Sequence, residues 1–137
     1  MKYRLPLTLF FLLFVGFYLN AQTEKNIKII FTTDVHGNYF PRDFITQKDW
    51  PGSLARVHQY VESQRKAYKG NVLLLDNGDI LQGQPTAYYS NYIDTVSPHI
   101  CSQVMNFMKY DAGNVGNHDV ETGRNVMAGT NGVQAID

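Results

Sequence analysis

The chain has 137 residues, which leaves room for one domain at most, and 44% of them are hydrophobic while 18% are charged. That balance is typical of a globular protein and excludes a disordered or fibrous chain. The formal net charge is zero, and no run of basic residues resembles the clustered face that binds a nucleic-acid polymer. The single cysteine, Cys101, excludes an internal disulfide framework.

The beginning of the chain differs in composition from the rest. Lys2 and Arg4 precede an uncharged, largely apolar run of 13 residues, residues 7–19, and the small Ala21 precedes a polar residue. This order is typical of a secretory signal peptide, so we predict a signal over residues 1–21. The alternative is a membrane anchor, but a membrane-spanning helix needs about 20 apolar residues. We therefore expect a periplasmic or secreted protein without a stable membrane anchor.

Three apolar runs, rich in residues that favour strands, are each followed by a polar cluster. The runs cover residues 27–33, 71–75 and 111–115, and the third is the weakest. Their near-continuous apolar character predicts strands that are buried on both faces, as in α/β sheets. The polar clusters that follow the three runs are residues 34–38, 76–82 and 116–119.

Two helical patterns lie between the predicted strands. Ser53 can cap the first helix, and Gly70 can close it. The apolar positions that recur in this helix near the 3.6-residue period are Leu54, Val57, Val61 and Tyr68. The second helix is predicted to start at Ser97-Pro98, with Pro98 at the first helical position. Its predicted inner stripe is Ile100, Val104, Phe107 and Met108.

The order strand, helix, strand, helix, strand predicts parallel βαβ units and therefore the α/β class. In such sheets ligands bind at the carboxyl ends of the strands, and all three polar clusters follow a predicted strand end. Each cluster alone is a weak signal, because Asp34 or Asp79 could cap a helix or form a turn. Asn117-His118 could likewise be a polar turn. The occurrence of all three clusters, each after a strand, favours a functional site.

The three clusters together resemble a family signature. They read Asp34-Val35-His36, Gly78-Asp79-Ile80-Leu81-Gln82 and Gly116-Asn117-His118-Asp119. The trio is similar to the signature of the calcineurin-like metallophosphoesterases, and specifically resembles the branch of exported 5'-nucleotidases and 2',3'-cyclic-nucleotide phosphodiesterases. The resemblance runs from about residue 27 to about residue 123 of a domain expected over residues 22–137, and the tail of residues 124–137 departs from it.

The resemblance implies the N-terminal part of a four-layer α-β-β-α sandwich with two divalent metal ions at the strand ends. Asp34 and His36 would hold the first ion. Asp79 would bridge the two ions, and Asn117 would bind the second. Oxygen and nitrogen ligands suit Mn, Zn, Fe or Co, and the absence of thiolates argues against a structural zinc site. Two such ions can share a bridging hydroxide and clamp a phosphate for in-line attack.

The resemblance also implies an acid for the leaving group. His118 would stabilise the transition state and protonate the departing alkoxide, and a protonated imidazole suits both tasks. This imidazole needs a carboxylate behind it to orient the ring and to favour its charged form. Asp119 and Glu121 are the candidates. Glu121 has the family's spacing of three residues after His118, although Glu replaces the more common Asp.

The chain lacks some of the ligands that the family supplies from later strands, because none of its four histidines follows His118. The second ion would have only Asp79 and Asn117, so we expect the 137-residue chain by itself to be inactive or impaired. The expected function is hydrolysis of small phosphate esters, in particular nucleotides. The alternatives are a catalytically inactive, truncated secreted remnant and a thioester or sulfate-ester hydrolase on the same scaffold.

Overall fold

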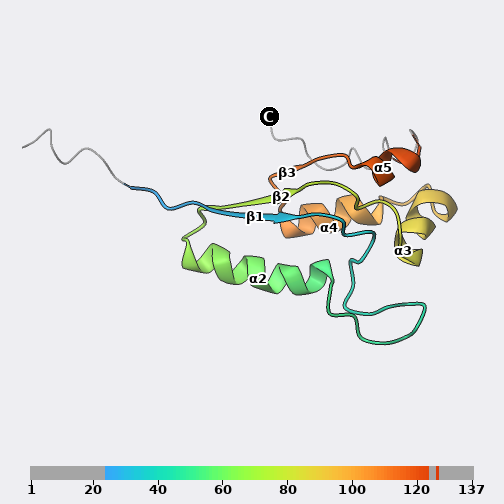
Figure 1. Cartoon of the computed structure of the whole chain (residues 1–137), viewed down its shortest axis with the longest axis horizontal. Helices are drawn as coiled ribbons and strands as arrows, with labels where there is room; N and C mark the ends of the chain where they lie inside the picture. Colours follow the sequence, from blue (N-terminus) through green and yellow to red (C-terminus); the bar gives the residue numbers. More distant parts are fainter. Residues whose placement is uncertain (1–23, 124–125, 127–137) are drawn as a thin grey trace, which may run out of the picture.

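The computed structural model describes residues 24–123 and residue 126 (Figure 1). The predicted signal peptide, residues 1–21, lies outside the described residues, as does nearly all of the tail of residues 124–137. Three parallel strands form one sheet in the order β1-β2-β3, and helices alternate with them along the chain. The predicted α/β class is confirmed. None of the helices in the described part is long and apolar enough to span a membrane.

The strands and helices have the following bounds. The strands are β1 (Lys28–Thr32), β2 (Val72–Asp76) and β3 (Ala112–Gly113). The helical segments are α2 (Leu54–Ala67), α3 (Pro85–Tyr88), the π-helical turn η1 (Tyr89–Ile93), α4 (Ile100–Met108) and α5 (Asn117–Glu121). The third strand is shorter than the predicted run 111–115, because only two of its residues pair with β2.

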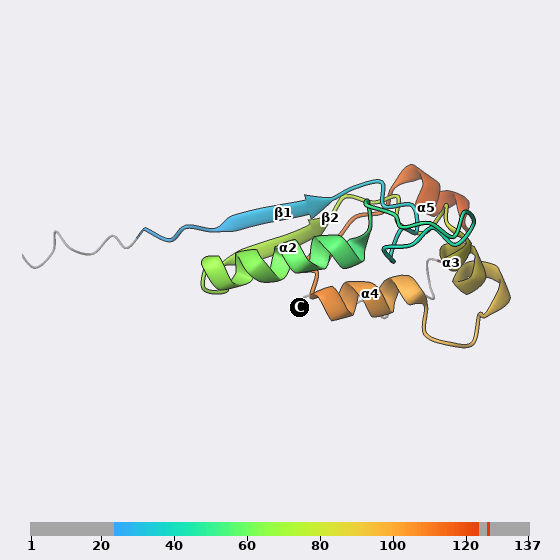
Figure 2. The ribbon, with the colours of Figure 1, turned by 90° about the horizontal axis from the view of Figure 1, so that it is seen from below.

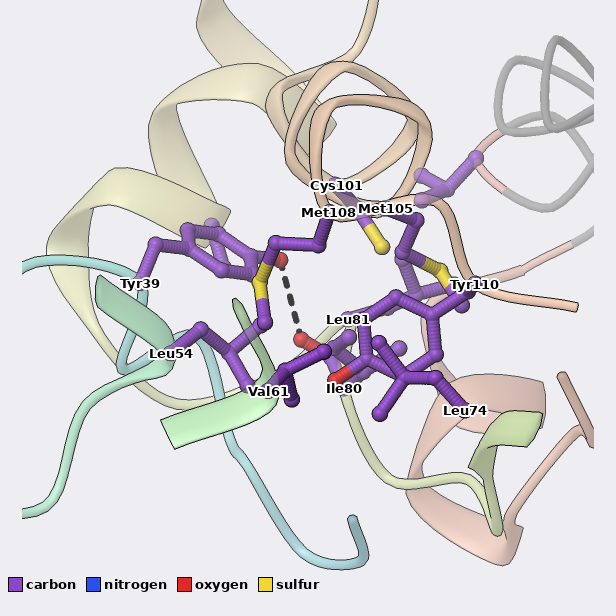
Figure 3. Close-up of a cluster of buried hydrophobic side chains, with 12 residues drawn as sticks. Tyr39, Leu54, Val61, Leu74, Ile80, Leu81, Cys101, Met105, Met108 and Tyr110 are labelled. Carbon is purple, nitrogen blue, oxygen red and sulfur yellow. Dashed lines mark hydrogen bonds between the residues drawn. The ribbon is translucent and has the colours of Figure 1, made fainter. Parts of the chain in front are cut away.

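The long helices cover one side of the sheet. α2 and α4 both lie on this side (Figures 1 and 2), and their buried residues Val61 and Met108 belong to the same core as Leu74 of β2. Figure 3 shows this core, in which the Tyr39 hydroxyl donates a hydrogen bond to the Ile80 carbonyl oxygen at 3.0 Å. The core therefore extends from the helices to the loop that follows β2.

The other side of the sheet carries exposed apolar side chains within the described part of the chain. Ile29, Phe31 and Leu73 are 58%, 68% and 40% exposed, respectively. The prediction of strands buried on both faces is therefore wrong for the described residues, since the described helices cover one face only. In a sandwich, an apolar face of this kind packs against a second layer.

The first long helix follows its predicted pattern. Ser53 occupies the N-cap position of α2, although its hydroxyl makes no capping hydrogen bond, and Leu54 and Val61 are buried in the core. Val57 packs against the same core, whereas Tyr68 lies just beyond the last helical residue as the C-cap. The 3.6-residue period thus identified the buried face of α2.

The second long helix begins later than predicted. α4 starts at Ile100 because His99 acts as its N-cap: the His99 Nδ1 accepts a hydrogen bond from the backbone N–H of Cys101 at 3.1 Å. Pro98 therefore lies before the helix and not at its first position. The other ring nitrogen of His99 contacts the side-chain oxygen of Asn91 at 2.7 Å, which ties the start of α4 to η1.

The buried face of α4 agrees with the predicted stripe except at Phe107, since Met108 is buried and Ile100 and Val104 pack against the core. Cys101, Met105 and Met108 are buried at the spacing i, i+4 and i+7, while Phe107 is 71% exposed. The Phe107 ring points away from the core and lies 5.0 Å from the ring of His58 on α2. The face of α4 that packs on the core is centred on Cys101 and Met105, and Phe107 lies outside it.

Candidate metal centre

The loops after β1 and β2 bring three metal-binding side chains together at the carboxyl end of the sheet. Asp34 and His36 follow β1, and Asp79 follows β2. One ligand atom from each of the three lies within 4.8 Å of the other two. The predicted first-ion ligands, Asp34 and His36, are therefore adjacent to the predicted bridging ligand, Asp79, although they are more than 40 residues apart in sequence.

All three residues have an unusual backbone conformation. Asp34, His36 and Asp79 have φ angles of 53°, 48° and 60°, in the left-handed region that non-glycine residues rarely adopt. Main-chain hydrogen bonds hold them there: the N–H of Asp34 donates to Gly78 at 3.1 Å, and that of His36 donates to Asp79 at 2.9 Å. Such strain persists where surrounding contacts over-determine the conformation, and it is typical of ligand-binding sites.

The donor atoms fit a divalent cation. The His36 Nδ1 lies 3.2 Å from the Gln82 carbonyl oxygen and must donate its proton there, so the Nε2 lone pair is available to a metal. This Nε2 lies 4.0 Å from Oδ1 of Asp34. Ligand bonds of about 2.0–2.2 Å place two ligand atoms of one ion about 3–4 Å apart. The pair therefore has the spacing that one shared ion would require.

The start of α5 brings the third polar cluster to the same place. The backbone N–H of His118 donates to the Asp79 Oδ1 at 2.8 Å, and the rings of His118 and His36 have centroids 5.3 Å apart. Asn117, the predicted second-ion ligand, is the first residue of α5 and is exposed beside His118. The structure thus brings residues from all three sequence clusters to one end of the sheet.

His118 has a carboxylate partner. Its Nδ1 lies 3.1 Å from Oε2 of Glu121, one turn later on α5. This hydrogen bond raises the pKa of His118 above its ordinary value, and it lowers the pKa of Glu121. The Gln82 side-chain amide donates to the same Glu121 oxygen at 3.2 Å and lowers the carboxyl pKa further. Of the two carboxylates that the sequence offered as partners of His118, Glu121 makes the contact.

Asp119, the other candidate, has a different role that the sequence did not reveal. Its side chain is buried, and its two oxygens accept four backbone N–H bonds. The donors, at 2.7–2.9 Å, are Asp79, Ile80, Leu81 and Gly116. Asp119 therefore joins the loop of Asp79 to the turn before α5. Its place beside Asn117-His118 was the available signal, but sequence alone cannot separate a carboxylate that faces a ring from one that faces main-chain amides.

Two glycines allow this close approach. Gly78 has a φ of 102°, and a Cβ there would collide with the backbone of Gly116. A Cβ at Gly116 would in turn collide with the Asp79 carboxylate. The Gly-Asp and Gly-Asn-His motifs thus need their glycines because the two loops are in direct contact.

Asp76, the last residue of β2, links the ends of β1 and β2 next to the site. Its Oδ1 accepts a hydrogen bond from the Thr32 hydroxyl at 2.6 Å, and its Oδ2 accepts one from the Gly78 backbone N–H at 3.0 Å. Burial raises the pKa of this carboxyl group above its ordinary value. The first carboxylate of the second cluster therefore stabilises the end of the strand, and it does not belong to the three-residue metal-binding group.

The fold and these side chains define an α/β protein with metal-binding residues at the strand ends. The chain belongs to the calcineurin-like phosphoesterase family, which matches residues 27–134. The trifunctional nucleotide phosphoesterase YfkN of Bacillus subtilis is 35% identical over 81% of the chain. The crystal structure of YfkN superimposes with a TM-score of 0.69 at 36% identity, over 76% of this chain and 33% of that one.

Other relatives are named as nucleotidases. The 2',3'-cyclic-nucleotide 2'-phosphodiesterase/3'-nucleotidase of Haemophilus influenzae is 35% identical over 79% of the chain. The 5'-nucleotidase of Homo sapiens is 34% identical over 88% of the chain. The chain spans only 8%, 17% and 20% of the length of YfkN, the Haemophilus protein and the human protein, respectively. The recognition of the family from its three motifs is confirmed, and membership makes the chain part of a family of metal-dependent phosphoesterases.

Proposed function

We propose that this chain supplies strand-end ligands and the leaving-group acid of a metal-dependent hydrolase for nucleotides and related small phosphate esters. The observation that carries the proposal is the cluster of Asp34, His36 and Asp79, whose ligand atoms lie within 4.8 Å of one another. The ring of His118 adjoins this cluster at 5.3 Å from that of His36. The names of the relatives, which are nucleotide phosphoesterases and nucleotidases, support the substrate class.

The residues divide the binding of two ions between them. Asp34 and His36 would hold the first ion, and Asp79, which lies between them and α5, would be shared by both. Asn117, at the start of α5, would hold the second ion through its side-chain oxygen. The donor set suits Mn, Zn, Fe or Co. Two bound ions of this kind lower the pKa of a water molecule and polarise a phosphate ester.

His118 and Glu121 move the proton. The Nδ1–H of His118 is held by Glu121 at 3.1 Å, so the other ring nitrogen, Nε2, is left to donate a proton to the departing alkoxide. Because Glu121 raises the pKa of His118, the ring keeps its proton to higher pH than a free imidazole. The protonated ring also places a positive charge where negative charge develops on the phosphate.

Metal binding is the decisive test, because it does not depend on turnover. Calorimetric titration of the metal-free chain with Mn²⁺, Zn²⁺ and Co²⁺ should show binding that His36→Ala weakens by at least about tenfold. His58→Ala, a matched histidine on α2, should bind as the parent does. Equal affinity of the parent and His36→Ala would remove this cluster from the metal site.

Hydrolysis tests the substrate class. The metal-loaded chain should hydrolyse 5'-AMP, p-nitrophenyl phosphate and its bis-ester weakly at most, because Asp79 and Asn117 are the only second-ion ligands we assign, and catalytic ions generally need about three protein ligands. Any turnover should require metal and vanish in His118→Ala. Hydrolysis of thioesters or sulfate esters in preference to phosphate esters would overturn the substrate proposal.

Export is a separate part of the proposal, supported by the composition of residues 1–21. Expression in a bacterium with a periplasm, followed by mass spectrometry of the exported chain, should give a mature protein that begins at Gln22. Exported protein with an intact Met1 would contradict the signal peptide.

A further inference from the structure

Gln82 has no part in the proposed chemistry, yet it contacts both sides of the site. Its main-chain carbonyl oxygen lies 3.2 Å from the Nδ1 of His36, a first-ion ligand. Its side-chain Nε2 donates to the Oε2 of Glu121 at 3.2 Å. A single residue of the loop after β2 therefore contacts both the metal-binding ring and the carboxylate behind the acid.

The side-chain contact falls on the oxygen that also serves His118. Nδ1 of His118 and Nε2 of Gln82 both lie within 3.2 Å of Oε2 of Glu121. An uncharged amide donor can hold a carboxylate without neutralising it, so the negative charge remains available to the imidazole. A cationic side chain at this position would compete with the ring for that charge.

Burial does not fix the carboxylate. The side chains of Glu121 and His118 are 55% and 40% exposed, and α5 is only five residues long. An exposed glutamate samples several rotamers, and only some of them reach the ring. A second hydrogen bond from a residue outside α5 selects among those rotamers, and Gln82 supplies it.

We propose that Gln82 is a positioning residue that holds Glu121 in the rotamer from which it accepts the Nδ1–H of His118. This role rests on the proposed function, in which the His118–Glu121 pair protonates the leaving group. The main-chain oxygen of Gln82 holds the ring of His36, and its side chain acts on the ring of His118 through Glu121. Gln82 therefore sets the relative placement of the two histidines, whose rings are 5.3 Å apart.

Gln82→Met is the informative variant. Methionine has about the same length and keeps the main-chain contact with His36, but it cannot donate to Glu121. Gln82→Glu adds a like charge next to Glu121 and should have the larger effect. The matched control is Gln103→Met on α4, which removes an exposed amide that donates to the Pro98 carbonyl at 2.7 Å, away from the catalytic pair.

The direct readout is the tautomer of each histidine, from long-range ¹H–¹⁵N spectra of the full chain at a pH where the rings are neutral. The parent should show the Nδ1–H tautomer at His118, because a carboxylate accepts at that atom. In Gln82→Met the population should move toward Nε2–H, while Gln103→Met should match the parent. His99 should keep its Nε2–H tautomer throughout, since its Nδ1 accepts the Cys101 N–H, and it serves as the check on folding.

An unchanged His118 tautomer in Gln82→Met, with His99 also unchanged, would overturn the positioning role. An equal shift in Gln103→Met would overturn it too. Where the parent hydrolyses bis(p-nitrophenyl) phosphate, Gln82→Met should lower kcat by about tenfold at constant KM, and should have no effect in a Glu121→Gln background. A parent that binds no metal in the calorimetric titration would count against the proposed function, and the tautomer spectra alone would then decide the role of Gln82.

Discussion

The two loops that carry the carboxylate ligands of the site are held in different ways. The loop of Asp34 is attached by main-chain bonds, in which Asp34, His36 and Gly37 donate to the loop after β2. That second loop, which carries Asp79, is attached to α5 and the turn before it by side-chain carboxylates: Asp119 accepts four backbone N–H bonds, and Asp79 accepts one from His118. Main-chain bonds survive a change of side chain, whereas a contact that depends on one carboxylate does not. The free energy of unfolding should therefore depend more on the Asp119 side chain than on the side chain of the ligand Asp34.

The largest effect is expected at Asp119. Asp119→Ala leaves four N–H donors, three in the loop after β2 and one in the turn before α5, without their acceptor, and each buried unsatisfied donor costs about 1–3 kcal/mol. We expect a loss of at least about 3 kcal/mol in the free energy of unfolding, measured by urea denaturation. Asp34→Asn, at an exposed carboxylate and with a residue that tolerates the left-handed φ of 53°, should change it by no more than about 0.5 kcal/mol. Similar losses in the two variants would contradict the distinction between the loops.

The next effect concerns metal affinity, which compares a ligand from each of the two loops. Asp79→Asn should weaken binding more than Asp34→Asn, because the bridging position serves two ions and Asp34 serves one. An asparagine at position 79 can still accept the His118 N–H, so the fold should be retained. We expect an additional loss of about tenfold for Asp79→Asn, measured by calorimetry and by metal content per chain. A parent-like metal content in Asp79→Asn would remove Asp79 from the bridge.

A smaller effect is expected where the helix layer meets η1. Burial lowers the pKa of His99 below its ordinary value of 6.5, because desolvation disfavours the charged ring. The folded state therefore binds a proton less readily than the unfolded state, and its stability falls as the pH drops below about 6.5. His99→Gln should be less stable than the parent at pH 7, and the gap in Tm should narrow by a few degrees at pH 5. An equal difference in Tm at pH 7 and pH 5 would show that protonation of His99 does not affect the stability of the fold.

The scaffold was largely predictable from the sequence because its signals are local. Apolar runs and the 3.6-residue period identified β1, β2 and α2 to within a few residues. The start of α4 was not predictable in this way, since it depends on a hydrogen bond from the Cys101 N–H to the ring of His99. Pro98, two residues before the first residue of α4, gave the stronger local signal for a helix start. The contact between His99 and Asn91, which sequence does not show, fixes His99 as the N-cap instead.

The site was predictable in its residues but not in its contacts. The strand-end motifs pointed to Asp34, His36 and Asp79, and the structure brings these three together. The distinct roles of Asp119 and Gln82 depend on bonds that span about 40 residues, whose direction no sequence pattern encodes. The left-handed backbone of the ligands was equally hidden, because it results from main-chain bonds between two loops.

The smallest effect is expected on the outer face of α4, at the one residue of the predicted stripe that does not face the core. Phe107 was expected in the core, yet it is 71% exposed and contacts the ring of His58 at 5.0 Å. Phe107→Ala should therefore change the free energy of unfolding by no more than about 0.5 kcal/mol. Met108→Ala is the matched control, because Met108 is buried and its truncation leaves a cavity that costs about 2–5 kcal/mol. Urea denaturation of both variants separates the two faces. A loss at Phe107 as large as that at Met108 would mean that the outer face of α4 is also buried, and the ring contact between α2 and α4 would then be part of the core.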